Sequence, residues 1–188
     1  HSKLLYDLHL SLLTHFGESW NQHSLVTMQR QTLSRILHYH EIYKEILDVP
    51  GVILEFGVQW GATLAQLIAF RGLYEPFNYR RHIFGFDTFS GFENINAEKD
   101  GVGLNQGDYK VYENYENSLE QILSLHEANC PIDHLKKFTL IKGDASKTVN
   151  EWSVENPNAL VALSIFDMDV YQPTVDALTA VLPRLTKG

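Results

Sequence analysis

The stretch "GVILEFGVQWGATLAQL", residues 51–67, decides the fold of this chain. Its residues 52–56 form a short apolar run with β-branched side chains, which is typical of a buried strand. Gly57 and Gly61 follow this run, and a helical pattern begins after them over residues 62–72. A glycine directly after a strand lets the backbone approach a ligand closely. The turn is therefore the first candidate binding element.

The rest of the chain repeats the order of strand and helix. Apolar runs predict further strands over 82–87, 138–144 and 159–169, and helical spacing predicts helices over 3–16, 27–47 and from Pro173 onward. Strands that alternate with helices and read as continuous apolar runs indicate a parallel sheet covered on both faces. We therefore expect an α/β protein, whose ligands bind outside the carboxyl ends of the strands.

Acidic residues occur at or near the end of each predicted strand, namely Glu55, Asp87, Asp144, Asp167 and Asp169. Because the carboxyl ends of parallel strands meet at one edge of a sheet, we expect these acids to gather there. Asp167 and Asp169 stand two apart, a spacing at which strand side chains point the same way. The alternative interpretation of this pair is a solvated strand end, or a helix N-cap before Pro173.

The glycine spacing indicates which kind of cofactor the edge would hold. It is G-x-x-x-G, without the middle glycine that lets a G-x-G-x-x-G turn approach a pyrophosphate. This favours an adenosine cofactor without a pyrophosphate, such as S-adenosylmethionine. Asp87 would then accept hydrogen bonds from both ribose hydroxyls, and Asp144 one from the adenine amino group. A plain strand–helix turn is the alternative interpretation of the glycines alone.

Composition excludes several other classes of partner. The 188 residues carry a formal net charge of −8, and no cluster of Lys and Arg offers a surface for nucleic acid. Cys130 is the only cysteine, so no intrachain disulfide is possible and a reducing, cytoplasmic location is expected. No apolar run reaches the ~18 residues of a membrane span, and we predict no membrane partner.

Four motifs carry a resemblance to a known family: "VILEFGVQWGATL", "IFGFDTFSGF", "LIKGDASKTV" and "ALVALSIFDMDVYQPTVDALTAVLPRLTKG". In this order they resemble the macrocin-type sugar O-methyltransferases, which are class I, S-adenosylmethionine-dependent and usually Mg²⁺-dependent enzymes of antibiotic and deoxysugar biosynthesis. "HEANC", "ENP" and "LTKG" are most similar to its dTDP-rhamnose 3-O-methyltransferases of enediyne biosynthesis. The resemblance covers residues 24–188 and implies a Rossmann-like class I methyltransferase fold.

The resemblance also implies roles for individual residues. Its cofactor-binding residues would be Glu55, Phe56, Gly57 and Gly61 at the methionine end, Thr27 and Met28 over that end, Asp87, Thr88 and Phe89 at the ribose, and Asp144 and Ala145 at the adenine. Asp167 matches a ligand to Mg²⁺, which would lower the pKa of the attacking sugar hydroxyl. Asp169 matches the general base that takes the proton.

The predicted organisation has two parts, a helical segment over 1–50 that covers the cofactor site and a cofactor-binding domain over 51–188. The polar, Tyr-rich segment 90–118 is interpreted as a lid over the acceptor, with a surface insertion as the alternative. The family's other metal ligands follow one strand after Gly188, and we expect more polypeptide there because such a sheet has further strands.

Function is predicted as methyl transfer to a small-molecule sugar acceptor by a homo-oligomeric protein. Two other classes stay open. One is a binding module that keeps the fold without the chemistry, against which the presence of Asp167 and Asp169 argues. The other is a nucleotide-dependent oxidoreductase, which the absent middle glycine disfavours.

Overall fold

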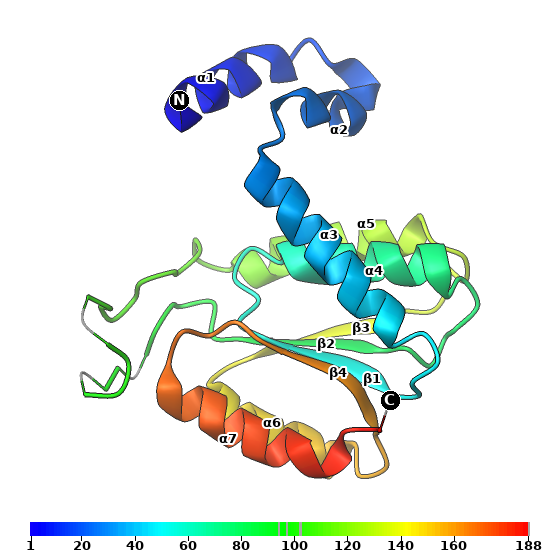
Figure 1. Cartoon of the computed structure of the whole chain (residues 1–188), viewed down its shortest axis with the longest axis vertical. Coiled ribbons are helices and arrows are strands. Elements are labelled where there is room, and N and C mark those ends of the chain that lie inside the picture. The colour runs from blue at the N-terminus through cyan, green and yellow to red at the C-terminus, as the bar shows by residue number, and fades with distance from the viewer. Residues whose placement is uncertain (94, 97, 102, 188) are drawn as a thin grey trace. The chain divides into compact units, whose positions relative to one another are not determined.

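The computed structural model describes residues 1–93, 95–96, 98–101 and 103–187. The chain divides into two compact units, 1–40 and 41–188, and the boundary falls inside helix α3 (Arg30–Glu45) (Figure 1). All described strands belong to the second unit.

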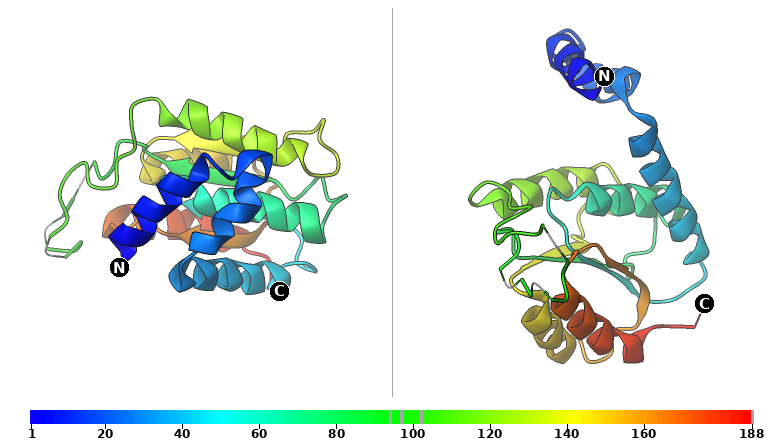
Figure 2. Two further views of the ribbon diagram at one scale, coloured as in Figure 1. Left: turned by 90° about the horizontal axis from the view of Figure 1, so that it is seen from above. Right: turned by 60° about the vertical axis from the view of Figure 1, so that its left-hand side comes forward.

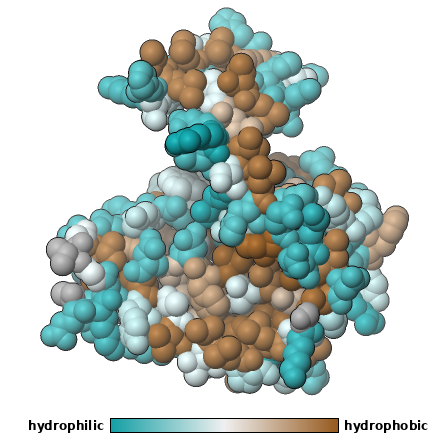
Figure 3. Space-filling model, in the orientation of Figure 1, coloured by the Kyte–Doolittle hydropathy of each residue, from teal (hydrophilic) through white to brown (hydrophobic). Residues whose placement is uncertain are grey.

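The N-terminal unit consists of helices and tight turns: α1 (Ser2–Leu13), η1 (Gly17–Ser19), α2 (Trp20–His23), η2 (Ser24–Thr27) and the first part of α3. A hydrogen bond of 2.6 Å between His9 Nδ1 and Thr27 Oγ1 joins α1 to η2. None of the residues of α1 is buried, and Figure 3 shows apolar side chains on the surface of this unit. Leu4 and Leu8, for example, are 62% and 48% exposed.

The second unit is built on a parallel sheet. Its described strands are β1 (Val52–Phe56), β2 (Ile83–Asp87), β3 (Phe138–Lys142) and β4 (Val161–Phe166), in the order β3-β2-β1-β4. All three neighbouring pairs are parallel, and in the last register position Phe56 lies between Phe86 and Phe166. The predicted α/β fold with a parallel sheet is confirmed.

Helices cover both faces of the sheet, as Figures 1 and 2 show. Helices α4 (Ala62–Tyr74) and α5 (Tyr115–Ala128) pack on one face, and α6 (Ala145–Glu155) and α7 (Tyr171–Val181) on the other. Because strand side chains alternate, Ile53 of β1 enters the α4–α5 core whereas Leu54 and Phe56 enter the α6–α7 core. Each face buries its own apolar cluster, and both clusters need β1.

Several predicted boundaries differ from the structure. The strand predicted over 159–169 ends at Phe166, and the one predicted over 138–144 ends at Lys142 because Asp144 is the N-cap of α6. The helix predicted over 27–47 begins at Arg30, after extended Met28. Helix α5 begins at Tyr115, so the predicted 90–118 segment includes its first turn.

A buried charge network fastens the amino-terminal edge of the sheet. Arg71 of α4 donates from Nη1 to the carbonyls of Lys137 (2.7 Å) and Arg81 (3.0 Å), and its Nη2 pairs with the carboxylate of Glu127. Glu127 also accepts from the Lys137 backbone N–H at 3.0 Å. Burial lowers the pKa of Arg71 to about 10, so its guanidinium is still charged at neutral pH.

Glu127→Gln is expected to lower the free energy of unfolding by about 3 kcal/mol or more, because it leaves the buried Arg71 guanidinium without its counter-charge. Urea unfolding followed by circular dichroism measures the change. The matched control is Glu120→Gln, which breaks an exposed pair with Lys136 and should cost about 1 kcal/mol or less. Equal losses for the two variants would contradict a stabilising role for the network.

Candidate functional site

Three backbone hydrogen bonds tie the carboxyl ends of the strands into one row. Asp167 N–H donates to Phe56 O at 2.8 Å, and Gly57 N–H donates to Phe86 O at 2.9 Å. Gly143 N–H donates to Asp87 O, also at 2.9 Å. The segments that follow β4, β1, β2 and β3 therefore lie side by side, and the predicted acids after these strands share this edge.

The turn after β1 needs its two glycines for packing. Gly57 has φ of 92°, and a Cβ there would overlap the carbonyl oxygen of Asp167. Gly61 has φ of 73° and is the N-cap residue of α4, and a Cβ there would overlap the side chain of Leu119. The glycine turn, residues 57–61, therefore passes directly against the end of β4 and leads into α4.

Asp87 connects the turn after β2 to the glycine turn. Its Oδ1 accepts the N–H of Phe89 at 2.6 Å, and its Oδ2 accepts the N–H of Gln59 at 2.8 Å. Each carboxylate oxygen can accept a second hydrogen bond, and the half-buried side chain can still meet a ligand. Phe89 is buried with φ of 57°, and the Thr88 hydroxyl donates to Gly91 O at 2.8 Å.

Asp144 and Ala145 form the start of α6 next to this turn. The Asp144 carboxylate caps the helix by accepting the N–H of Ser146 at 3.0 Å, while Ala145 is buried in the first turn. Capping uses one oxygen of a half-exposed carboxylate and leaves further lone pairs. The predicted contact of both residues with an adenine stays a prediction.

Asp167 and Asp169 are exposed, but they are not strand residues. Both follow the last residue of β4, and Asp169 has a left-handed backbone with φ of 54°. The predicted strand alternation therefore does not relate their side chains. Asp169 does not cap the next helix either, since the N-cap residue of α7 is Val170, without a side-chain bond.

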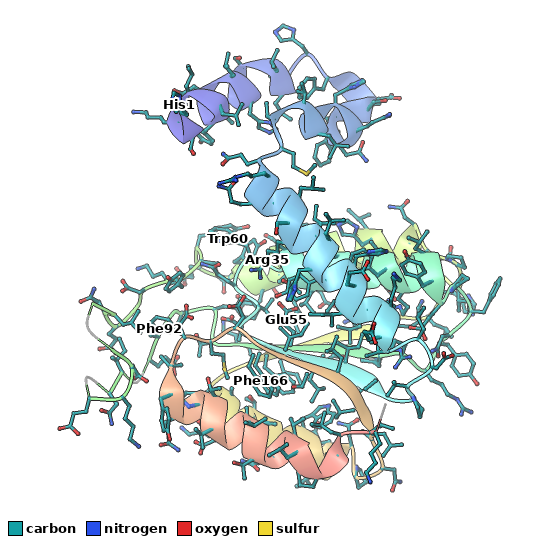
Figure 4. All side chains as sticks on the ribbon, viewed as in Figure 1. His1, Arg35, Glu55, Trp60, Phe92 and Phe166 are labelled. Atoms are coloured by element: carbon teal, nitrogen blue, oxygen red, sulfur yellow. The ribbon has the colours of Figure 1, made fainter. Side chains whose placement is uncertain are left out.

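Glu55 and Phe56 belong to opposite faces of β1, and Figure 4 shows Glu55 on the α4–α5 side of the sheet and Phe166 on the α6–α7 side. Glu55 is a buried acid with 2% of its surface exposed. The Phe56 ring is fully buried and stacks on Phe86 at 4.5 Å and on Phe166 at 5.1 Å between centroids. The Phe56 side chain therefore packs in the core next to the carboxyl ends of β1, β2 and β4.

Thr27 and Met28 belong to the N-terminal unit. The Thr27 hydroxyl donates to Ser24 O at 3.0 Å and contacts His9, and Met28 is extended between η2 and α3. Their predicted place over the cofactor stays a prediction.

An aromatic group beside the glycine turn was not predicted as functional. The Tyr115 hydroxyl donates to Trp60 O at 3.0 Å, and the two rings meet edge to face at 4.9 Å. Tyr112 contacts Tyr115 at 5.0 Å, and Trp60 and Tyr112 are 50% and 54% exposed. Trp60 is 55 positions from Tyr115 in the sequence, and nothing in the local pattern signals their contact.

Metal-binding clusters and membrane-spanning helices are both absent from the described part of the chain. In it, no group of three or more His, Cys, Asp or Glu side chains is arranged to hold a metal ion. Its helices also lack the length and apolar character that crossing a membrane requires.

Comparison with solved structures gives the class and then the family. The crystal structure of CalS11, described as a calicheamicin methyltransferase, has a TM-score of 0.92 and 37% identity, covering 98% of this chain and 74% of that chain. The apo structure of CalS11, a TDP-rhamnose 3'-O-methyltransferase of calicheamicin biosynthesis, has a TM-score of 0.83 and 33% identity at the same coverage. The O-methyltransferase NovP shares the fold, with a TM-score of 0.56 and 19% identity over 82% of this chain and 61% of that chain.

The fold and its row of strand ends are those of a Rossmann-like methyltransferase. With 37% identity to CalS11, the chain belongs to the macrocin-type sugar O-methyltransferase family, as its motifs predicted. No protein-family model matches the chain, and no curated protein sequence matches it.

Gly57→Ala is expected to destabilise the protein more than a glycine substitution with open space around it. Gly107, with φ of 82° and no atom within 4 Å of the place that a Cβ would take, provides the control. Gly107→Ala should cost about 1–2 kcal/mol for the left-handed backbone. Gly57→Ala should cost about 1–3 kcal/mol more, because the methyl group meets the Asp167 backbone. Parallel urea unfolding curves measure both, and equal costs would contradict the close approach.

Proposed function

We propose that the protein transfers a methyl group from S-adenosylmethionine to a hydroxyl of a nucleotide deoxysugar. The observation that carries the proposal is the bonded pair of turns, in which Asp87 holds the Gln59 backbone beside Gly57. This arrangement puts an acid and a close backbone approach at adjacent strand ends. The similarity to CalS11, described as a TDP-rhamnose 3'-O-methyltransferase, supports the choice of acceptor.

The described edge fits an adenosine cofactor. Asp87 would accept from the ribose hydroxyls through the lone pairs that Phe89 and Gln59 leave, and Asp144 would accept from the adenine amino group. The glycine turn, with Glu55 before it, would lie against the methionine end, and Thr27 and Met28 would cover that end. When bound, S-adenosylmethionine supplies an activated methyl group.

The acceptor hydroxyl needs a base, because an alcohol is a poor nucleophile near neutral pH. Asp169 is exposed on the turn after β4 and would accept this proton. Asp167 offers the oxygen donor that Mg²⁺ prefers, and Mg²⁺ often takes only one or two protein carboxylates. The donor chemistry thus fits, and a bound Mg²⁺ would lower the pKa of the hydroxyl. The bond from Asp167 N–H to Phe56 O would hold the backbone of this site in place.

Asp87→Asn is expected to weaken binding of S-adenosylhomocysteine about tenfold to a hundredfold, because hydrogen bonds to a charged group are worth about 1.5–3 kcal/mol. Isothermal titration calorimetry measures the affinity. Asp133→Asn, in an exposed loop, is the control and should bind as the unmodified protein does. NAD should give no heat. Unchanged affinity in Asp87→Asn, with the unfolding midpoint preserved, would exclude the ribose role.

Removal of divalent metal is expected to stop methyl transfer and to spare cofactor binding. Turnover of TDP-rhamnose with S-adenosylmethionine, followed as a mass gain of one methyl group, should fall in EDTA and recover with added Mg²⁺. Binding of S-adenosylhomocysteine should survive EDTA, because Asp87 and the glycine turn need no ion. Full turnover in EDTA would remove the metal from the proposal and leave Asp169 as a metal-free base.

Asp169→Asn is expected to lower kcat by about 10²-fold or more while S-adenosylhomocysteine binds as before, because the variant lacks the proton acceptor. Initial rates at saturating acceptor measure this effect. Asp176→Asn, which alters an acid on the surface of α7, is the matched control. A wild-type kcat in Asp169→Asn would assign the proton to another group.

A further inference from the structure

The loop between β2 and α5 is bonded to the helix that follows β4. It leaves the sheet after Asp87 of β2, and its residue Asp100 accepts a hydrogen bond from the N–H of Tyr171, which begins α7 after β4. Strand β1 lies between β2 and β4 in the sheet. The loop therefore starts at the end of β2 and is bonded at Asp100 to the helix that follows β4, and β1, where the glycine turn begins, lies between these two strands.

The base of this loop is closed by contacts between its two arms. Phe92 N–H donates to Asp108 O at 3.2 Å, and Gly107 N–H donates to Phe92 O at 2.9 Å. The Phe92 ring also meets the Tyr109 ring at 5.3 Å between centroids, and Figure 4 shows Phe92 in this loop. The two arms are thus paired at Phe92, and Asp100 lies between the paired positions in the sequence.

Asp100 fastens the far part of the loop to α7. Its Oδ1 accepts the Tyr171 N–H at 2.6 Å, and its Oδ2 accepts the Asn96 N–H, also at 2.6 Å. The ammonium group of Lys99 lies 4.9 Å from the centroid of the Tyr171 ring. These two backbone hydrogen bonds hold the pKa of Asp100 below its usual value.

Helix α7 lacks a cap from its own sequence. Its N-cap residue is Val170, which cannot accept a hydrogen bond through its side chain. The first N–H groups of a helix have no partner within the helix, and a carboxylate near them is favoured by the helix dipole. Asp100, 71 positions earlier in the chain, supplies the acceptor instead.

The bond to Asp100 also fixes the turn that holds the two exposed acids. That turn is held at its start by the bond of 2.8 Å from Asp167 N–H to Phe56 O, and at its end by the bond from Tyr171 N–H to Asp100. Asp169 lies between these points in a left-handed conformation with φ of 54°. Loss of either bond would free one end of the turn. The Asp169 side chain would then no longer be held in one orientation.

We infer that Asp100 is a positioning residue for methyl transfer, which bonds the loop after β2 to the start of α7 and fixes the turn that carries Asp169. The inference rests on the proposed function, because Asp169 acts as a base only in that reaction. Asp100 touches neither the cofactor nor the reacting atoms, and its effect passes through Tyr171. Under the proposed function the acceptor would bind beside Asp169, so loss of the Asp100 bond would also affect acceptor affinity.

The test compares Asp100→Ala with Glu98→Ala, which removes an exposed acid from the same loop without touching α7. Amide hydrogen exchange at Tyr171, read by nuclear magnetic resonance, should be tenfold faster or more in Asp100→Ala and unchanged in Glu98→Ala. KM for the sugar acceptor should rise about tenfold and kcat should fall, while the Kd of S-adenosylhomocysteine stays within twofold. Asp100→Asn, which keeps one oxygen acceptor, should lie between Asp100→Ala and the unmodified protein.

The outcomes separate the inference from the function on which it rests. Unchanged Tyr171 exchange in Asp100→Ala would overturn the bond itself. Faster exchange with unchanged kcat and KM would overturn the positioning role and leave a cap for α7. If the unmodified protein methylates no sugar and binds no S-adenosylhomocysteine, the proposed function fails and the positioning role fails with it. The exchange rates would still decide whether Asp100 holds Tyr171.

Discussion

The close contact between the backbones of Gly57 and Asp167 is the constraint on which the functional edge depends. Asp167 N–H bonds to Phe56 O at 2.8 Å, so the chain leaving β1 has to pass over the Asp167 carbonyl. Only a residue without a Cβ fits there, and its φ of 92° suits glycine alone among common residues. The chain then turns toward β2, where Gln59 meets Asp87. This one contact thus sets the course of the glycine turn, the place where α4 begins and the approach of the turn to Asp87.

The acids at this edge stabilise the fold while they keep capacity for a ligand. Asp87, Asp144 and Asp100 each accept backbone N–H groups that would otherwise lack partners at a turn or a helix start. A carboxylate offers about four lone-pair positions, so one or two such bonds do not exhaust it. Under the proposed function, the side chains of Asp87 and Asp144 would therefore position the backbone and also receive a ribose or adenine donor. A substitution of Asp87 or Asp144 would remove both contributions, which is why binding and unfolding have to be measured together.

The sequence could predict the features that depend on local pattern. The apolar runs and glycine spacing predict the parallel sheet and the turn after β1, because these follow from periodicity and from what a glycine permits. The strand predicted over 159–169 was too long, because the end of β4 is set by its pairing partner β1, which stops at Phe56 opposite Phe166. The left-handed backbone of Asp169 and the bond between Asp100 and Tyr171 could not be predicted from the sequence either. Both depend on segments that meet only in the folded chain.

The two edges of the sheet use charge in opposite ways. Before β2, Arg81 is 2% exposed and donates to the carbonyls of Val49 and Gly51 at 2.8 Å, and its guanidinium also pairs with Glu75. A buried charge is tolerable only when it is paired in this way, and Arg81 directs its donors to groups of the fold. The carboxyl edge carries Asp167 and Asp169, whose exposure avoids that desolvation cost. The guanidinium of Arg81 is thus held within the fold, whereas Asp167 and Asp169 are exposed on a turn whose backbone is bonded to Phe56 O.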